Sequence, residues 1–599
     1  MKKIVYAFIL ILFCASNLQS FALETEILKA GLKSGIENFV DKHKDTTAAV
    51  SIAVFTNEDI LFERSFGFIN ITGNVKNHSD AVFEWGSAGK LLVWVSVMQL
   101  VEQGLLDLHA DIRYYLPAGF LRRLSFEEPI TMIHLMNHTP GFQDIHLLTV
   151  RPGRRIRELG DVLKRFEPPQ LFRPGEVVAY SNYGTALAGF IVELISGKPF
   201  YQYVHDHIFA PLNMTKTALK TDLRDNEWVQ TQRTKIHGYT WNLRSRGKAS
   251  FLTPFYPAGQ ATGTISDFRK FAQALLPCEN GASPLFRYPE TLEQLFTPTA
   301  FFPDGKTARI FHGFMSYPHL SGNVLGHGGN TAGMSSHLLI DLESKVGMVV
   351  MANQVQESTY NFHLPLLVFG EADFSALNNS ANDVPIDGIY RMARGYKRGI
   401  SRALSLMLIP LFESNEEILT KAAPGVYKFT GFGMMFLLFA SADESGNLQY
   451  LTSFVTDFVK QNNALVVFEL FVTVLFVISG FYGLVMLIIM IIKKLRKKEQ
   501  ILPCLRTGIY AASFAAIINF FVFILSVFLF FASLPGVIFH GILFILLTIA
   551  VIFCIIKIAL RAKIINLVKK QKRQLIITSL TGIIVVINVF YWQLWMFWI

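Results

Sequence analysis

Cysteine is scarce in this chain, with four in 599 residues. Cys14, Cys504 and Cys554 lie in or beside long apolar stretches near the two ends of the chain, which leaves Cys278 alone in the polar part. A lone cysteine cannot build a disulfide framework, so the small disulfide-stapled classes of secreted domain are excluded. Stability must therefore come from an apolar core, and a domain of roughly 340 residues is long enough to bury one.

Two catalytic signatures are also absent. No His-Glu-x-x-His is present, so the helical zinc site that this pattern forms is not expected. His134 and His138 have the spacing of a zinc pair, but the residues that follow offer only loose third ligands, and we predict no metal. At Ser87, Trp85 stands where Gly-x-Ser-x-Gly requires its first glycine, which excludes an α/β-hydrolase.

What the chain does contain is a hydroxyl and an amine at the predicted start of a buried helix. Ser87-x-x-Lys90 directly precedes the apolar run 91–95. Helix positions three apart share a face, and a helix N-terminus favours both an alkoxide and a neutral lysine. The pattern therefore indicates an activated serine nucleophile, with a helix N-cap as the alternative role of the serine. A second match, Ser245-x-x-Lys248, has no apolar helix behind it and is interpreted as chance.

A second segment offers a base. Tyr180-x-Asn182 follows a turn at 173–176 and precedes small and apolar residues at 184–191. Beside a cationic lysine a phenol titrates below its ordinary pKa of about 10, so we expect Lys90 to lower the pKa of Tyr180, which then takes the serine proton. The amide of Asn182 can position the lysine and a substrate amide.

A third segment is rich in glycine. Four glycines surround His327 and allow a backbone to come very close to a ligand. The runs 336–341 and 346–351 are predicted to be paired strands of one sheet. A strand edge at the glycines can give one N–H to an oxyanion, with the serine N–H giving the other; by position this group is that of Asn330, next to Gly329.

In this order, Ser-x-x-Lys, Tyr-x-Asn and His-x-Gly resemble the motifs of the serine β-lactamase and penicillin-binding-protein superfamily. The tyrosine motif looks like that of the class C branch, which includes D-alanyl-D-alanine carboxypeptidases and esterases. Three further segments, at 130–142, 208–214 and 257–267, resemble sequences of the same branch. The resemblance covers about residues 30–365 and implies an α/β fold, with an antiparallel sheet flanked by helices.

The resemblance also implies two-step acyl transfer without a metal or organic cofactor. Ser87 would be the nucleophile, Tyr180 and Lys90 would handle its proton, and Asn182 and His327 would orient the substrate. His327 stands where class C β-lactamases carry lysine, and a largely neutral histidine holds a carboxylate less firmly. This departure favours the peptidase and esterase members and leaves β-lactam hydrolysis open.

The two ends of the chain indicate a membrane protein. Residues 1–22 resemble a signal peptide, and four apolar stretches at about 465–492, 509–532, 537–556 and 575–598 are each long enough to span a bilayer. Basic residues gather between the first and second and between the third and fourth stretches, which places these connections in the cytoplasm. They largely account for the net charge of +10, so anionic lipid is the expected partner and nucleic acid is not.

The segment between these parts is harder to interpret. Hairpin patterns at 431–450 predict a small β-rich juxtamembrane domain over 371–460, after a hydrolase domain over 23–370 and before a membrane domain over 461–599. Residues 391–412 are basic and then apolar, which fits either a helix on the membrane surface or a buried helix.

These features predict a multi-pass protein of the cell membrane with an extracytoplasmic serine hydrolase domain. Its expected substrates are amides or esters such as D-amino-acid peptides of peptidoglycan, β-lactams or small esters. One alternative is a penicillin-binding receptor that is acylated without turnover and signals through its helices. Another is a transporter module, against which the lack of charge inside the spans, Glu469 excepted, argues weakly.

Overall fold

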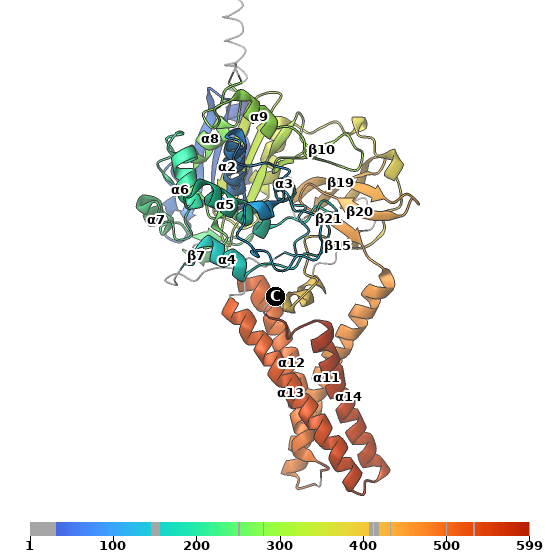
Figure 1. Cartoon of the computed structure of the whole chain (residues 1–599). Helices are drawn as coiled ribbons and strands as arrows, with labels where there is room; N and C mark the ends of the chain where they lie inside the picture. Colours follow the sequence, from blue (N-terminus) through green and yellow to red (C-terminus); the bar gives the residue numbers. More distant parts are fainter. Residues whose placement is uncertain are drawn as a thin grey trace, which may run out of the picture.

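The computed structural model describes residues 31–144, 156–248, 252–278, 281–406, 411–412, 418–431, 433–498, 500–530 and 534–597. The predicted signal peptide lies outside these residues. Along the chain, a mixed α/β domain is followed by a β-domain and by four long helices (Figure 1).

The first domain is built on a nine-stranded sheet that joins strands from its two ends. β1 (Ala49–Phe55) lies between β2 (Ile60–Asn70) and β14 (Val346–Ala352), and the order is β3-β2-β1-β14-β13-β12-β11-β10-β9 with antiparallel pairing throughout. The other strands are β3 (Val75–Lys76), β9 (Ala300–Phe301), β10 (Ala308–Phe311), β11 (Phe314–Ser316), β12 (Val324–Asn330) and β13 (Ser335–Asp341). The predicted pair at 336–341 and 346–351 is confirmed as β13 and β14.

Helices flank this sheet, and one of them is buried on every side. In α2 (Lys90–Glu102), residues 91–95 have no exposed surface, which explains why this stretch is apolar all round rather than amphipathic. It packs against α5 (Asn182–Ser196), and α8 (Ile265–Ala274) packs against β1 and β14. The shorter helices are α3 (Met132–Met136), α4 (Leu159–Arg165), α6 (Phe200–Val204), α7 (Glu227–Arg233), α9 (Pro289–Leu295) and α10 (Leu364–Phe369). The predicted α/β architecture with an antiparallel sheet is confirmed.

Small strands complete this domain. β4 (Val82–Glu84), β8 (Thr262–Thr264) and β5 (Thr217–Ala218) form a three-stranded sheet, and β6 (Gly238–Tyr239) pairs with β7 (Ser245–Gly247). Ser245 of the second Ser-x-x-Lys match therefore begins an exposed strand and not a helix.

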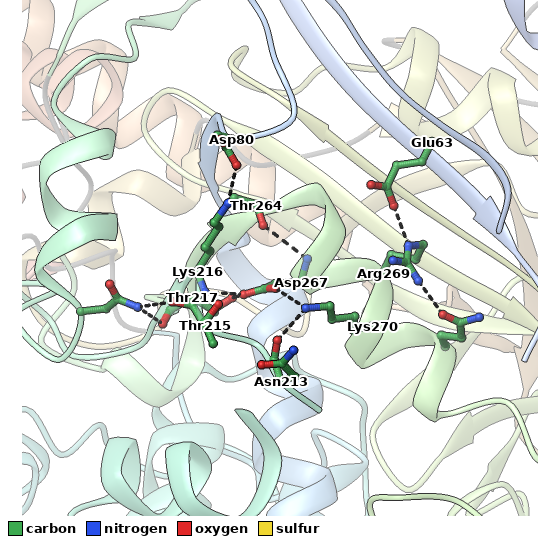
Figure 2. A network of polar contacts seen from close by, with 12 residues as sticks. Glu63, Asp80, Asn213, Thr215, Lys216, Thr217, Thr264, Asp267, Arg269 and Lys270 are labelled. Atoms are coloured by element: carbon green, nitrogen blue, oxygen red, sulfur yellow. Dashed lines mark hydrogen bonds and ion pairs between the residues drawn. The ribbon is translucent and has the colours of Figure 1, made fainter. Parts of the chain in front are cut away.

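Asp267, at the end of the segment 257–267, holds the residues that follow the segment 208–214 (Figure 2). Asp267 accepts hydrogen bonds from the Lys216 backbone N–H at 2.7 Å and from the Thr217 hydroxyl at 2.9 Å. Thr264 caps α8 by accepting from the Asp267 N–H at 3.4 Å, and Arg269, one turn on, pairs with Glu63 at 2.6 Å. These residues fix α8 to the sheet and have a structural role.

The β-domain is a seven-stranded antiparallel sheet of order β16-β15-β21-β20-β19-β18-β17. Its strands are β15 (Gly388–Met392), β16 (Leu411–Phe412), β17 (Leu419–Ala423), β18 (Val426–Gly431), β19 (Met434–Ala442), β20 (Leu448–Thr452) and β21 (Asp457–Lys460). The described residues of the range 391–412, which are 391–406 and 411–412, do not form the long helix considered from the sequence. They leave β15, form the 3₁₀ helix η8 (Ile400–Leu406) and enter β16, and Ile400, Ala403 and Leu404 pack against the long helices.

The four apolar stretches form four long helices that extend away from the first domain in Figure 1. They are α11 (Asn463–Leu495), α12 (Pro503–Phe530), α13 (Leu534–Ile564) and α14 (Lys569–Tyr591), each long and apolar enough to cross a membrane. Of the four predicted spans, the last one, 575–598, differs most from the helix in the structure. Its helix begins with the basic turn at 569–573 and ends at Tyr591. Just beyond that end, Met596 O accepts a hydrogen bond from the Ile400 N–H of η8 at 3.0 Å.

Candidate active site

Ser87 lies on a tight turn between the small sheet and the buried helix. The structure places it in the 3₁₀ turn η1 (Gly86–Gly89), and the α-helix begins only at Lys90. In a 3₁₀ turn, positions i and i+3 eclipse, so the serine and the lysine still share a side. Gly86 has φ +54°, and a Cβ there would lie 2.8 Å from the Asn330 backbone nitrogen, so the turn and β12 approach too closely for a side chain.

Lys90 is fully buried and its amine faces three oxygens. Nζ lies 3.1 Å from Ser87 Oγ, 2.7 Å from Asn182 Oδ1 and 2.5 Å from the Ala258 carbonyl. A neutral amine has two N–H donors and one lone pair. The Asn182 Oδ1 and the Ala258 carbonyl oxygen can only accept hydrogen bonds. They therefore take both N–H donors of a neutral Lys90, and its lone pair is left to face the Ser87 hydroxyl.

Electrostatics also favour the neutral amine. Burial lowers the pKa of Lys90 well below its ordinary value, the charge of Arg394 lowers it further, and Asp144 opposes this. Lys90 is thus held neutral more readily than a free lysine, which suits it to accept a proton.

Tyr180 lies beside this pair, just before α5, whose N-cap Ser181 accepts from the Gly184 N–H at 3.0 Å. The ring packs against the His138 ring at 4.4 Å between centroids, and Lys90 Nζ lies 4.9 Å from its centroid. Its hydroxyl lies 3.5 Å from His327 Nε2, and Ser87 acts on its pKa.

The expected lowering of the Tyr180 pKa is wrong. Burial raises the pKa of the phenol above its ordinary value, and this outweighs the lowering by Ser87 and Arg394. The sequence argument assumed a cationic Lys90, whereas burial disfavours charge on both groups. Tyr180 is therefore a protonated donor in the resting site, and the lysine is the better base.

His327 is held as a neutral imidazole. Nδ1 lies 2.6 Å from the Gly328 carbonyl, so Nδ1 carries the proton and Nε2 is left to accept from Tyr180. Burial lowers the pKa of His327 to about 3. This neutral side chain offers no positive charge to a substrate carboxylate near pH 7.

The glycine-bearing end of β12 lies directly against the serine turn. A Cβ on Gly329 would come within 1.9 Å of the Trp85 carbonyl, so only glycine permits this contact. Asn330 follows at the exposed strand end, where its Oδ1 accepts from the Gln356 N–H at 3.1 Å. The structure thus brings all the residues predicted from the three motifs to one place.

Two charged residues at the site escaped the sequence analysis. The guanidinium carbon of Arg394 lies 4.7 Å from the Tyr180 ring centroid, and Arg394 Nε lies 2.7 Å from Asp144 Oδ2. Arg394 follows β15, so the β-domain supplies part of the wall of this site. Nothing local in the sequence marks it, because the contact depends on how two domains dock.

The β-domain also holds the strand that leads to the tyrosine. Asp457, the first residue of β21, accepts from the Val178 N–H at 2.8 Å and donates its own N–H to Val178 O at 2.9 Å. Its second oxygen is 2.8 Å from Arg309, and both side chains are almost fully buried. The backbone two residues before Tyr180 is therefore fixed by an ion-paired carboxylate.

The two histidines with zinc spacing have structural roles. His134 Nδ1 accepts from the Thr131 N–H at 3.1 Å in the capping box of α3, and His138 Nδ1 accepts from the Ser181 N–H at 3.3 Å. Within the described residues, no group of three or more His, Cys, Asp or Glu side chains is placed to hold a metal ion.

Comparison with known proteins agrees with this geometry. The family model described as Beta-lactamase matches residues 36–370, more than half of the chain. The chain belongs to this family. The resemblance stated from the motifs is thus confirmed, and members of this family are serine hydrolases.

Individual relatives are distant. The chain is 24% identical over 323 residues to penicillin-binding protein 4* of Bacillus subtilis (strain 168), which is 50% of this chain and 67% of that protein. It is 30% identical over 245 residues to penicillin-binding protein 4 of Amycolatopsis lactamdurans, which is 39% of this chain and 60% of that protein. The crystal structure of SurE has a TM-score of 0.51 at 18% identity, covering 72% of this chain and 99% of SurE, and supports the fold alone.

Proposed function

We propose that this protein is a membrane-anchored serine hydrolase that works through an acyl-enzyme formed on Ser87. The observation that carries this proposal is the arrangement at Lys90, whose amine lies 3.1 Å from the serine hydroxyl while its two other neighbours are pure acceptors. A base that is neutral at rest and lies beside a hydroxyl is what nucleophilic catalysis by serine requires.

The proposed reaction has two steps. Neutral Lys90 takes the Ser87 proton as the oxygen attacks a carbonyl carbon, and the N–H groups of Ser87 and Asn330 stabilise the oxyanion. The protonated Tyr180 gives its proton to the leaving amine or alcohol and is reprotonated from Lys90. Water then attacks the acyl-enzyme in the reverse proton sequence, which releases a carboxylic acid and restores the serine.

The proposed substrates are acyl compounds with a scissile amide or ester, such as D-amino-acid peptides of peptidoglycan, β-lactams or small esters. The neutral His327 supports peptide and ester substrates over β-lactams, because it gives a carboxylate no fixed charge. The positive charge beside Tyr180 belongs instead to Arg394.

The proposed orientation places the catalytic domain outside the cytoplasm. Lys493 and Lys494 lie in the last turn of α11, and Arg561 and Lys563 lie in the last turn of α13. Both turns are at the end of the bundle away from the first domain in Figure 1, and the positive-inside rule assigns that end to the cytoplasm.

The first test is intact-mass spectrometry of the full chain in detergent, with benzylpenicillin and separately with a p-nitrophenyl ester. An adduct or a burst of nitrophenol that is lost in Ser87→Ala supports the proposal. Wild-type turnover that survives in Ser87→Ala, or no adduct and no turnover with any acyl donor, rejects it. The full chain is needed because η8 packs on the long helices.

A receptor that is acylated without turnover remains the second candidate. It is favoured by a chain of contacts from the site to the bundle. Arg394 contacts Tyr180, while Arg391 and Arg402 of the same segment pair with Glu469 of α11. The lifetime of the adduct separates the two, since a receptor keeps its acyl group and a hydrolase releases it.

A further inference from the structure

A charged cavity lies where the β-domain meets the first long helix. Its volume is about 360 Å³, within the range of small-molecule sites. Four cationic side chains line it, together with one carboxylate, that of Glu469; the cations are Arg391, Arg394, Lys397 and Arg402. The cavity is separate from the serine and shares only Arg394 with the wall of the candidate active site.

The nearby carboxylates do not balance these cations. Glu469 serves both Arg391 and Arg402, the latter at 3.8 Å, and also accepts from the Tyr591 hydroxyl at 3.2 Å. Arg394 has Asp144 as its partner. A third carboxylate, that of Glu176, acts on Lys397. Four cations therefore face three carboxylates, which leaves a surplus of one positive charge.

Two groups in the cavity wall lack a counterpart in the described part of the chain. Lys397 forms no ion pair there, and its amine lies 3.9 Å from the Phe172 ring centroid. Arg391 Nε is buried without a hydrogen-bond partner among the same residues. Burial lowers the pKa of Lys397, Glu176 opposes this, and Arg391 adds to the lowering. An anion would satisfy these donors and relieve the repulsion between the cations.

The cavity lies at the depth of lipid headgroups. α11 has 33 residues, whereas the hydrocarbon layer needs only about 20. Counting back from the basic pair Lys493 and Lys494, about 20 residues place the start of the hydrocarbon near residue 473. Glu469, which lines the cavity, therefore lies about one turn above it, among the headgroups of the leaflet that faces the catalytic domain, and Leu465 lies a further turn outward.

An apolar surface adjoins the charged wall. Leu465 lines the cavity, and the side chains of Phe471 and Val474, further along α11 toward the hydrocarbon, are largely exposed. A free phosphate would use only the basic wall, whereas a lipid would use both surfaces.

We propose that this cavity binds the phosphate of an anionic phospholipid, with the acyl chains lying along the exposed apolar side of α11. The proposal rests on the membrane insertion in the proposed function and not on hydrolysis. Lys397 and Arg402 hold the phosphate oxygens, and the surplus positive charge selects an anionic headgroup over a zwitterionic one.

The test is native mass spectrometry of the full chain in non-ionic detergent, titrated with dioctanoyl phosphatidylglycerol, dioctanoyl phosphatidylcholine or glycerol 3-phosphate. We expect one phosphatidylglycerol per chain, bound at least about fivefold more tightly than phosphatidylcholine, and no competition by glycerol phosphate. Lys397→Gln should weaken binding about fivefold and Lys397→Arg should restore it, because one cation near a phosphate contributes about that factor.

Matched variants make the result specific. Lys493→Gln removes a cation at the other end of α11 and should leave binding unchanged, while Ser405→Asp adds a carboxylate to the cavity wall and should weaken it. Equal binding of the two lipids, or equal loss in Lys397→Gln and Lys493→Gln, would overturn the proposal. Tight binding of glycerol phosphate alone would assign the cavity to a soluble phosphate instead. None of these readouts depends on turnover, so failure here is distinct from failure of the hydrolase proposal.

Discussion

The guanidinium of Arg394 lies over the ring of Tyr180, with 4.7 Å between Cζ and the ring centroid. Arg394 belongs to the β-domain and Tyr180 to the first domain, so the candidate active site is formed by both. The same guanidinium is held by Asp144 at 2.7 Å, which fixes its plane against the phenol. The β-domain therefore contributes directly to the candidate active site. A β-domain that only separated this site from the membrane would not need the contact between Arg394 and Tyr180.

Removing Arg394 should move the acid limb of the pH–rate profile to higher pH. Arg394 lowers the pKa of Lys90, and Asp144, which it pairs with, raises it. Arg394→Gln removes the first effect and leaves the second unopposed, so the pKa of Lys90 rises and less of it is neutral at a given pH. We expect the limb of kcat/KM to shift upward by about one pH unit, equivalent to about 1.4 kcal/mol.

Arg394→Lys is the control for this change, because it keeps the charge near the ring. Its acid limb should stay close to that of the wild type even if the rate falls. A limb that does not move in Arg394→Gln would show that the β-domain charge has no influence on the base.

Lys90 should be irreplaceable by arginine. If Lys90 acts as a neutral base, a guanidinium that cannot lose its proton is as ineffective as an apolar side chain. We expect Lys90→Arg and Lys90→Met to lower the acylation rate to the same extent, by about 10²- to 10⁴-fold. Stopped-flow measurement of the p-nitrophenol burst gives this rate. Retention of most activity in Lys90→Arg would mean that the positive charge matters and that Tyr180 or another group is the base.

The sequence predicted which motif residues lie together but not their charge states. Ser87, Lys90 and Tyr180 are recognisable because each lies in a short pattern next to a local structural signal, a buried helix or a turn. The pKa of Tyr180 was predicted in the wrong direction because it depends on burial, which arises only when α2, α5 and β12 come together. Arg394 could not be found, because 214 positions separate it from Tyr180 and no local pattern marks a contact between domains.

Removing the buried carboxylate of Asp457 should destabilise the protein and also impair acylation. Asp457→Ala leaves Arg309 buried without its partner at 2.8 Å, a change that typically costs about 3–5 kcal/mol. It also frees the backbone at Val178, two residues before Tyr180. Thermal unfolding in detergent and the burst rate should both report the change.

Replacing both charges separates these effects. Arg309→Met combined with Asp457→Leu removes the unpaired charge and should recover most of the lost stability. The acylation rate should stay low, because the bond to the Val178 N–H is still missing. Full recovery of the rate in the double variant would show that the bond does not position Tyr180.

Two adjacent glycines of β12 should differ in their response to the same substitution. A Cβ on Gly329 would lie 1.9 Å from the Trp85 carbonyl, so Gly329→Ala must push β12 away from the turn that holds Ser87. A Cβ on Gly328 meets nothing closer than 3.8 Å, and Gly328→Ala should fit without movement. The proposed oxyanion site lies between the N–H groups of Ser87 and Asn330, so separating these elements should lower kcat by about 10²- to 10³-fold, the usual effect of losing one such donor. Gly328→Ala should retain wild-type kcat and the same unfolding temperature. Equal activity of the two variants would mean that the close contact of β12 with the serine turn contributes only to packing, and the oxyanion would then have to be stabilised elsewhere.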